Sequence, residues 1–181
     1  MKRVRLLLIM VLMTVMMAVM CCAEANYPAT LNNGNLVLVD GGMGVGRYAD
    51  RSSVSVQRYE PPYYQIAINI VTINFSDDYW RKHNTYVGGP YKVTYVSPAF
   101  FRYNWNYKLV SHLHHDGIWR DWDINKDYCH ADGNPFVPNA AETAFVAAYK
   151  MRFYGNTMGF SPVLKKKYRV ISEDFYRKLG I

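Results

Sequence analysis

The chain has 181 residues, of which 50% are hydrophobic and 15% aromatic, and its 21 Lys and Arg against 14 Asp and Glu give a net charge of +7. This composition excludes a disordered chain and is typical of a folded domain with a substantial core. The moderate positive charge favours an anionic partner, but no nucleic-acid-binding motif accompanies it, so nucleic acid is not an expected partner.

The first 25 residues have the pattern of a secretory signal peptide. A basic start with Lys2, Arg3 and Arg5 precedes an apolar run at 6–20, and Ala23-Glu24-Ala25 matches the small-x-small site that signal peptidase cleaves. The apolar run is too short for a membrane span. A lipidated Cys21 or Cys22 is the alternative, although Met20 is larger than the residue that normally precedes such a cysteine.

Cleavage after Ala25 leaves residues 26–181, which we expect to form a single domain with a net charge of +5 and no stable membrane span. The protein is then secreted, periplasmic or on the cell surface. Cys129 is the one cysteine of this part, so an intramolecular disulfide is excluded, and the domain depends on apolar packing. A small half-buried side chain is the favoured role of Cys129, and pairing between chains is the alternative.

The first half of the domain is predicted to consist of β-strands. Strands are expected at 36–39, at 48–59 and at 65–75, and a flexible glycine-rich connection is expected at 41–46. In the strongest strand, Ile66, Ile68 and Ile70 share one face, whereas Val71, Ile73 and Phe75 have the opposite parity. That switch indicates either a bulge or a strand buried on both faces.

The next segment is predicted to be a polar loop at 77–90, followed by strands at 91–96, 100–107, 108–114 and 118–124, then a loop at 125–138. Asp116-Gly117 is a hairpin signal between the last two strands. Tyr103, Trp105 and Tyr107 alternate with polar residues, so we expect these three aromatic side chains to form the buried face.

Helical spacing begins after residue 138. Asn139 as N-cap with Glu142 as its capping-box partner predicts a helix over about 139–155, ended by Gly155. A last strand is expected at 168–171, and a short helix at 172–179 between Ser172 and Gly180. The predicted fold class is therefore α+β: a mostly antiparallel β-sheet with one main packed α-helix and a short C-terminal helix.

Two groups of residues are candidate sites. His112 and His114 lie two residues apart on a predicted strand and therefore on one face, so they could bind a divalent metal with Asp116 or His130 as a further ligand. The alternative is a polar strand end beside a turn. The second group is a basic cluster that could bind an anionic partner, against the alternative of a solvated strand edge; it consists of Lys165, Lys166, Lys167 and Arg169.

Two stretches carry a resemblance to known proteins. Tyr48-Ala49-Asp50-Arg51-Ser52-Ser53-Val54 resembles the opening of the surface-adhesin protein E-like domains of bacterial envelopes. The layout of Phe101–Trp105, Gly117–Trp119 and Glu142–Gly155 is similar to that of small exported proteins of diderm Firmicutes. The resemblance implies an antiparallel sheet with a packed helix and, in adhesin-E members, binding to host matrix proteins.

The resemblance transfers no binding residue. Asp50, Ser52 and Ser53 match its motif, and side-chain-to-backbone hydrogen bonds that cap a turn at a strand entry are a structural explanation for them.

The sequence therefore favours an exported, non-enzymatic protein of the bacterial envelope or the medium, with an adhesin-like binding role. Its partner is expected to be a host matrix protein or an envelope component, without a cofactor. The alternative is an exported metal-binding protein or metal-dependent enzyme that uses His112, His114 and Asp116 with a divalent metal. The sequence leaves the oligomeric state open.

Overall fold

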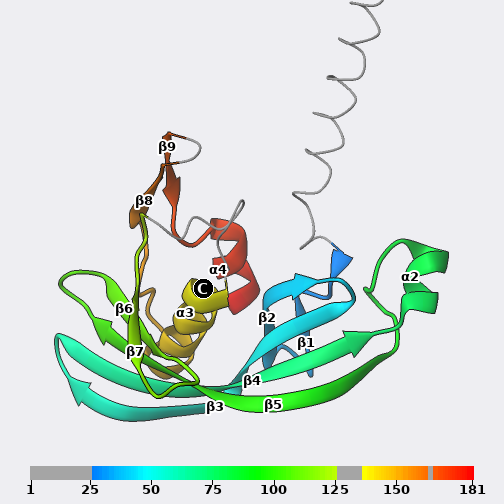
Figure 1. Ribbon diagram of the computed structural model, residues 1–181, viewed down its shortest axis with the longest axis horizontal. Coiled ribbons are helices and arrows are strands. Elements are labelled where there is room, and N and C mark those ends of the chain that lie inside the picture. Colours follow the sequence, from blue (N-terminus) through cyan, green and yellow to red (C-terminus); the bar gives the residue numbers. More distant parts are fainter. Residues whose placement is uncertain (1–25, 126–135, 163–164) are drawn as a thin grey trace, which may run out of the picture.

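The computed structural model describes residues 26–125, 136–162 and 165–181, so the predicted signal peptide, Cys129 and His130 lie outside the described residues. Seven strands form one antiparallel sheet in which spatial order follows chain order (Figure 1). They are β1 Thr30–Leu31, β2 Leu36–Gly42, β3 Val45–Glu60, β4 Tyr63–Phe75, β5 Tyr91–Asn104, β6 Leu109–Leu113 and β7 Trp119–Trp122.

Helices and a separate hairpin complete the described part of the chain. The helices are α2 Asp77–His83, α3 Phe136–Tyr149 and α4 Glu173–Leu179, and the hairpin consists of β8 Met158–Ser161 and β9 Lys166–Arg169. The predicted α+β class, with an antiparallel sheet, a main packed helix and a short C-terminal helix, is confirmed. No helix among the described residues is long and apolar enough to cross a membrane.

The glycine-rich stretch 41–46 is a tight hairpin and not the expected flexible connection. Gly42 pairs with Val45, which leaves a two-residue turn of Met43 and Gly44, both at positive φ (53° and 79°). Positive φ at both turn residues matches the right-handed twist of the flanking strands. The Gly44 N–H also donates to the Tyr27 hydroxyl at 2.9 Å, which fixes the turn against the start of the domain.

β4 takes part in two cores, one on each face of the sheet. Ile66, Ile68 and Ile70 belong to the large core, whereas Val71, Ile73 and Phe75 belong to a small one. The small core consists of Tyr27, Leu36, Leu38, Tyr48, Val71, Ile73, Phe75 and Tyr86. Because Ile70 and Val71 are consecutive, their side chains point to opposite faces. Of the two predicted explanations, burial on both faces is therefore the one observed.

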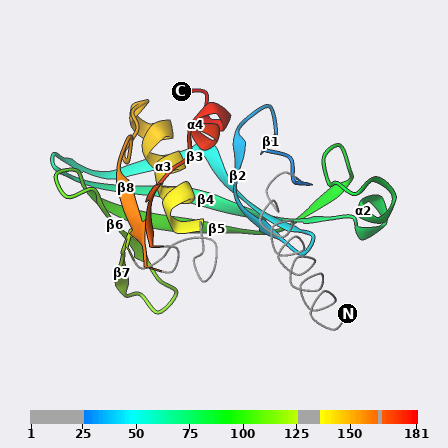
Figure 2. The same ribbon diagram turned by 90° about the horizontal axis from the view of Figure 1, so that it is seen from above.

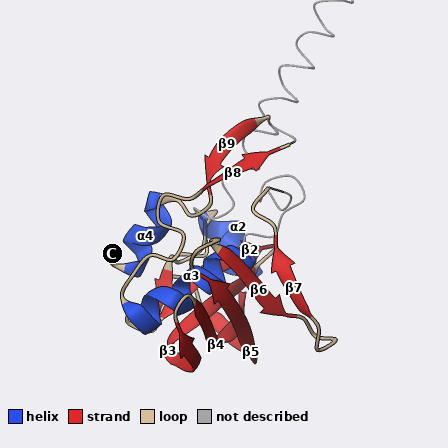
Figure 3. Ribbon diagram, turned by 90° about the vertical axis from the view of Figure 1, so that its left-hand side faces the viewer, coloured by secondary structure: helices blue, strands red, loops and turns tan. Residues whose placement is uncertain are grey.

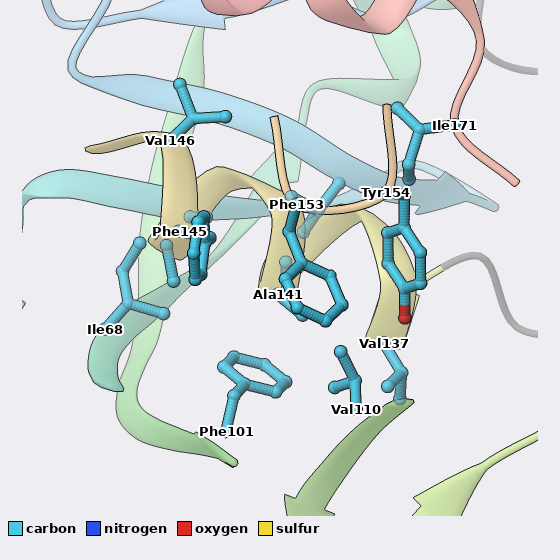
Figure 4. Packing of buried hydrophobic residues seen from close by; sticks show 14 of the residues in the cluster. Ile68, Phe101, Val110, Val137, Ala141, Phe145, Val146, Phe153, Tyr154 and Ile171 are labelled. Carbon is cyan, nitrogen blue, oxygen red and sulfur yellow. The ribbon is translucent and has the colours of Figure 1, made fainter. Parts of the chain in front are cut away.

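The large core lies between the sheet and the two C-terminal helices, which cover its concave side (Figure 1). Ala141 and Ala144 let α3 approach the strands closely, while Phe145 reaches toward Phe153 and Ile68 (Figure 4). The ring centroids of Phe145 and Phe153 are 5.2 Å apart. Close-packed aromatic and aliphatic side chains of this kind supply much of the stability of a folded domain.

The main helix differs from its predicted limits. α3 covers Phe136–Tyr149 and stops at Lys150, which has φ 57°, so residues 150–155 are not helical. Asn139 is inside the helix and not its cap: its side-chain N–H donates to the Val39 carbonyl at 3.1 Å. Asn139 and Glu142 match the capping-box pattern, but their side chains form tertiary contacts and do not cap the helix.

Local capping signals account for the other two helices. α4 begins after Ser172, whose hydroxyl accepts the Phe175 N–H, and ends at Gly180 with φ 76°, as predicted. The predicted loop at 77–90 is wrong in its first half, where α2 forms. Its N-cap Ser76, two acidic residues in its first turn and a basic last turn are all favourable for a helix.

The strands in the second half also differ from the prediction. The segments 91–96 and 100–107 are one strand, β5, which ends at Asn104 and has Pro98 within it. Tyr103 is buried and Trp105 partly buried as predicted, but Tyr107 is exposed because it lies in the turn after β5. β1 and β8 were not predicted, and the last strand lies at 166–169 and not at 168–171.

Candidate functional site

The basic cluster lies on the β8–β9 hairpin, which stands away from the seven-stranded sheet (Figures 1 and 3). In the register of this hairpin, Lys166 pairs with Ser161 and Lys167 with Phe160. Lys165 lies in the connecting turn with φ 51°. The hairpin thus brings the three lysines to its free end, whereas Arg169 lies near its base.

The base of the hairpin is fixed to the segment after β7. The Tyr168 hydroxyl donates to the Ile124 carbonyl at 2.5 Å, and the Phe160 N–H donates to Asn125 Oδ1 at 3.1 Å. Gly159 allows this close contact, since a Cβ there would lie 2.5 Å from the same Ile124 oxygen. The lysines are therefore presented by an anchored element.

The four basic side chains have different surroundings. Arg169 forms an ion pair with Glu173, which also binds Arg152 at 3.1 Å. Lys165, Lys166 and Lys167 are exposed, and within residues 26–125, 136–162 and 165–181 no carboxylate lies within ion-pair distance of them. The structure therefore separates the predicted cluster into three lysines, which have no counter-ion in the part of the chain that the structure describes, and one arginine that is paired with Glu173.

Apolar side chains share one face of the hairpin with part of the basic cluster. Phe160 is directly opposite Lys167, and Met158 is opposite Arg169. Both apolar side chains are substantially exposed. Cross-strand partners in an antiparallel pair point to the same face, so this face combines apolar and cationic groups.

The histidine cluster lies at the end of β6 and in the turn that follows. The ring centroids of His112 and His114 are 6.3 Å apart, and His114 Nδ1 lies 3.3 Å from Asp116 Oδ2. The Asp116 carboxylate also accepts the Ile118 N–H at 2.9 Å and binds Arg120 at 2.5 Å. These contacts, led by the Ile118 N–H, lower the pKa of Asp116.

The structure thus brings His114 and Asp116 together, but Arg120 already occupies the carboxylate. Among the described residues, no three His, Cys, Asp or Glu side chains gather as a metal-binding group. His130, the other predicted ligand, lies outside the described residues. The metal hypothesis therefore remains a prediction from the sequence.

Asp50, Ser52 and Ser53 form a side-chain-stabilised bulge within β3, and not a cap at its entry. Asp50 pairs with Asn69 and Ser55 with Ala67, so β3 contains extra residues at this point. Asp50 Oδ1 accepts the Ser52 N–H at 3.0 Å, and Ser53 Oγ accepts the Asn69 N–H at 2.8 Å. The expected side-chain-to-backbone hydrogen bonds are present, and they satisfy backbone groups that the bulge leaves unpaired.

Glu142 is a buried titratable residue that the sequence placed at a helix cap. Its carboxylate accepts the Phe153 N–H at 2.9 Å, the Tyr154 N–H at 3.1 Å and the Tyr176 hydroxyl at 2.8 Å. Burial raises its pKa to about 7, although these hydrogen bonds oppose the shift. Glu142 therefore joins α3 to the following loop and to α4. Its position in the middle of an apolar helical face was the available signal of burial.

A small surface hollow lies at the tip of the β2–β3 hairpin. Its volume is about 210 Å³, and Asp40 and Arg47, which are 3.0 Å apart, form part of its wall. Pockets for drug-sized ligands usually have volumes of about 300–1,000 Å³. The hollow therefore offers no enclosed site for a substrate of that size.

Comparison with known proteins gives no match to a protein family, to a curated protein or to a solved structure. The resemblance to adhesin-E-like domains therefore remains a prediction from the sequence.

Proposed function

We propose that this protein is an exported, non-enzymatic binding protein of the bacterial envelope or its surroundings, and that it contacts an acidic partner through the β8–β9 hairpin. The partner is a host matrix protein or an envelope component with an anionic surface. Export is supported by the basic, apolar and small-x-small pattern of residues 1–25.

The observation that carries this proposal is the anchored hairpin with Lys165, Lys166 and Lys167 at its free end. These three charges have no counter-ion among the described residues, and the β8–β9 hairpin that carries them stands away from the seven-stranded sheet (Figure 3). Exposed charges without internal partners attract and orient an oppositely charged surface at little desolvation cost. Phe160, opposite Lys167, adds apolar area beside them.

The test compares two triple variants of residues 26–181 for binding to immobilised poly-L-glutamate. Replacing all three lysines by Gln is expected to weaken binding by between about 3-fold and about 150-fold, because each exposed charge pair contributes about 0.2–1 kcal/mol. The control, Arg81→Gln with Lys82→Gln and Lys150→Gln, removes the same charge from other exposed positions. Equal losses in the two variants would show that only net charge matters and would remove the hairpin from the proposal.

The same assay separates this proposal from the metal alternative. Substituting His112→Ala together with His114→Ala is expected to leave binding unchanged, since these residues lie on β6 and the turn after it and not on the hairpin. Loss of binding in a folded double variant, or its recovery with added zinc, would favour the metal-dependent function instead.

A further inference from the structure

The two faces of the β8–β9 hairpin have different surroundings. Tyr168 pairs with Gly159, and its hydroxyl donates to the Ile124 carbonyl, so this face is turned toward the segment after β7. Alternate residues along a strand point to opposite faces. The other face, which we call the outer face, therefore carries Met158, Phe160, Lys167 and Arg169.

The outer face combines exposed apolar side chains with cations. Exposed fractions are 45% for Phe160 and 48% for Met158, so about half of the surface of each is in contact with water. Their cross-strand partners are Lys167 and Arg169, respectively. Each apolar side chain therefore lies beside a basic one.

Positive charge also prevails at both ends of the hairpin. At its base, Glu173 pairs with Arg169 and with Arg152, and two arginines on one carboxylate leave one positive charge in excess. At its free end, the lysines 165–167 have no carboxylate within ion-pair distance in the part of the chain that the structure describes. The whole element therefore favours contact with an anionic surface.

The hairpin is placed where it would meet an extended surface early. It lies at the β6–β7 end of the molecule, away from β1 and α2 (Figure 2), and it extends past α3 and α4 on the side that these helices cover (Figure 1). The hydrogen bonds to Ile124 and Asn125 hold its base. A flat surface that approaches from this side therefore meets the hairpin before it meets the two helices.

We infer that the outer face binds the surface of a bilayer that contains anionic lipids. This inference rests on the proposed function and names its anionic partner. The lysine ammonium groups contact lipid phosphates, while their alkyl stems lie along the apolar boundary. Phe160 and Met158 enter the region between the headgroups and the acyl chains, where their exposed area leaves water.

The apolar half of the outer face is what favours a bilayer over other anionic partners. A highly charged polymer, such as an acidic glycan or poly-L-glutamate, neutralises the lysines but offers little apolar area to Phe160 and Met158. An anionic bilayer offers phosphates and hydrocarbon within one interface, in the order that a basic hairpin with apolar side chains requires.

Co-sedimentation with lipid vesicles tests the inference on residues 26–181. The vesicles consist either of phosphatidylcholine alone or of equimolar phosphatidylcholine and phosphatidylglycerol, and binding is expected to be much stronger to the second kind. Replacing Phe160 and Met158 by Ser is expected to weaken that binding by between about 10-fold and about 150-fold, because about half of each side chain is left to bury. The control, Tyr107→Ser with Ile118→Ser, removes exposed apolar side chains outside the hairpin and is expected to leave binding unchanged.

A conservative variant tests whether residue 160 enters the bilayer. Phe160→Trp is expected to retain vesicle binding, because Trp also prefers the membrane interface. Its added fluorescence, obtained by subtracting the wild-type spectrum, is expected to shift to shorter wavelength when vesicles are present. An unshifted spectrum would contradict insertion.

Two binding results would overturn the inference. One is the absence of binding to both kinds of vesicle, and the other is equal binding by the wild type and by Phe160→Ser with Met158→Ser. Poly-L-glutamate binding is expected to be the same in that double variant, since its three lysines remain. If the lysine-dependent binding to poly-L-glutamate persists without vesicle binding, the proposed function stands and its partner is an acidic protein or glycan. Failure of the proposed function is a separate result, namely poly-L-glutamate binding that does not depend on the three lysines.

Discussion

Replacing Glu142 by Gln should remove a pH dependence of stability that this carboxyl group imposes on the fold. Burial raises its pKa from 4.5 to about 7, so the folded protein holds the proton more tightly than the unfolded chain. The contribution of Glu142 to the free energy of unfolding is therefore fully present below pH 4.5 and is lost as the pH rises to about 7. Raising this pKa from 4.5 to about 7 changes the free energy of unfolding by about 3 kcal/mol between the two ends of that pH range.

The same contacts predict what Gln changes at low pH. In Gln, an NH₂ group takes the place of one carboxylate oxygen and cannot accept the hydrogen bonds that this oxygen accepts in Glu142. The lost bonds are either the one from the Tyr154 N–H or those from the Phe153 N–H and the Tyr176 hydroxyl. Leaving a buried donor unsatisfied costs about 1–3 kcal/mol. At about pH 5 the wild type should therefore be more stable than Glu142→Gln by about that amount, and the difference should close or reverse by about pH 8.

Urea denaturation followed by far-UV circular dichroism at several pH values measures this difference directly. Subtracting the two proteins cancels the other titrating groups, which both share. A difference that stays constant between about pH 5 and about pH 8 would refute the reasoning, and so would one that grows with pH. Growth would mean that the three hydrogen bonds, helped by nearby Lys108, outweigh burial and stabilise the charged carboxylate.

Two further predictions concern the β3 bulge and export. Substituting Ser53→Ala should lower the free energy of unfolding by about 1–2 kcal/mol, because the Asn69 N–H loses its acceptor, and it should leave poly-L-glutamate binding unchanged. Urea titration and the binding assay check the two parts, and weaker binding by the folded variant would show that the bulge contributes to the contact surface. Protease treatment of intact cells should release peptides of residues 26–181 detectable by mass spectrometry. Protection until the envelope is opened would place the protein in the periplasm and contradict binding to a host matrix protein.

Signals that act over a few residues were sufficient to predict part of the fold. α4 was predicted at both ends because Ser172 and Gly180 cap it through contacts within its own turns. The change of parity among the apolar residues of β4 was apparent from the sequence, but it left a bulge and burial on both faces as alternatives, and the structure has the second. α2 carried equally local signals in Ser76 and its charged first and last turns, but it was missed because its polar composition resembles that of a loop.

The candidate site could be predicted less completely. The lysine run 165–167 was apparent from the sequence, and its exposure follows from the cost of burying unpaired ammonium groups. The neutralisation of Arg169 depends on Glu173 in a different element, α4. Asn139 and Glu142 have a helix-capping pattern, yet their partners are Val39 on β2 and Tyr176 on α4, contacts that sequence spacing does not reveal.

The sequence by itself determined the class of fold, the C-terminal helix and the presence of a basic segment, because periodicity, capping residues and charge act within one or two turns of chain. Only the tertiary structure decided that Ile70 and Val71 face different cores and that Glu142 is buried. It also decided that β6 pairs only with Phe101 to Asn104 of β5. These features depend on which distant segments meet, and such long-range contacts come from packing the whole chain around its cores.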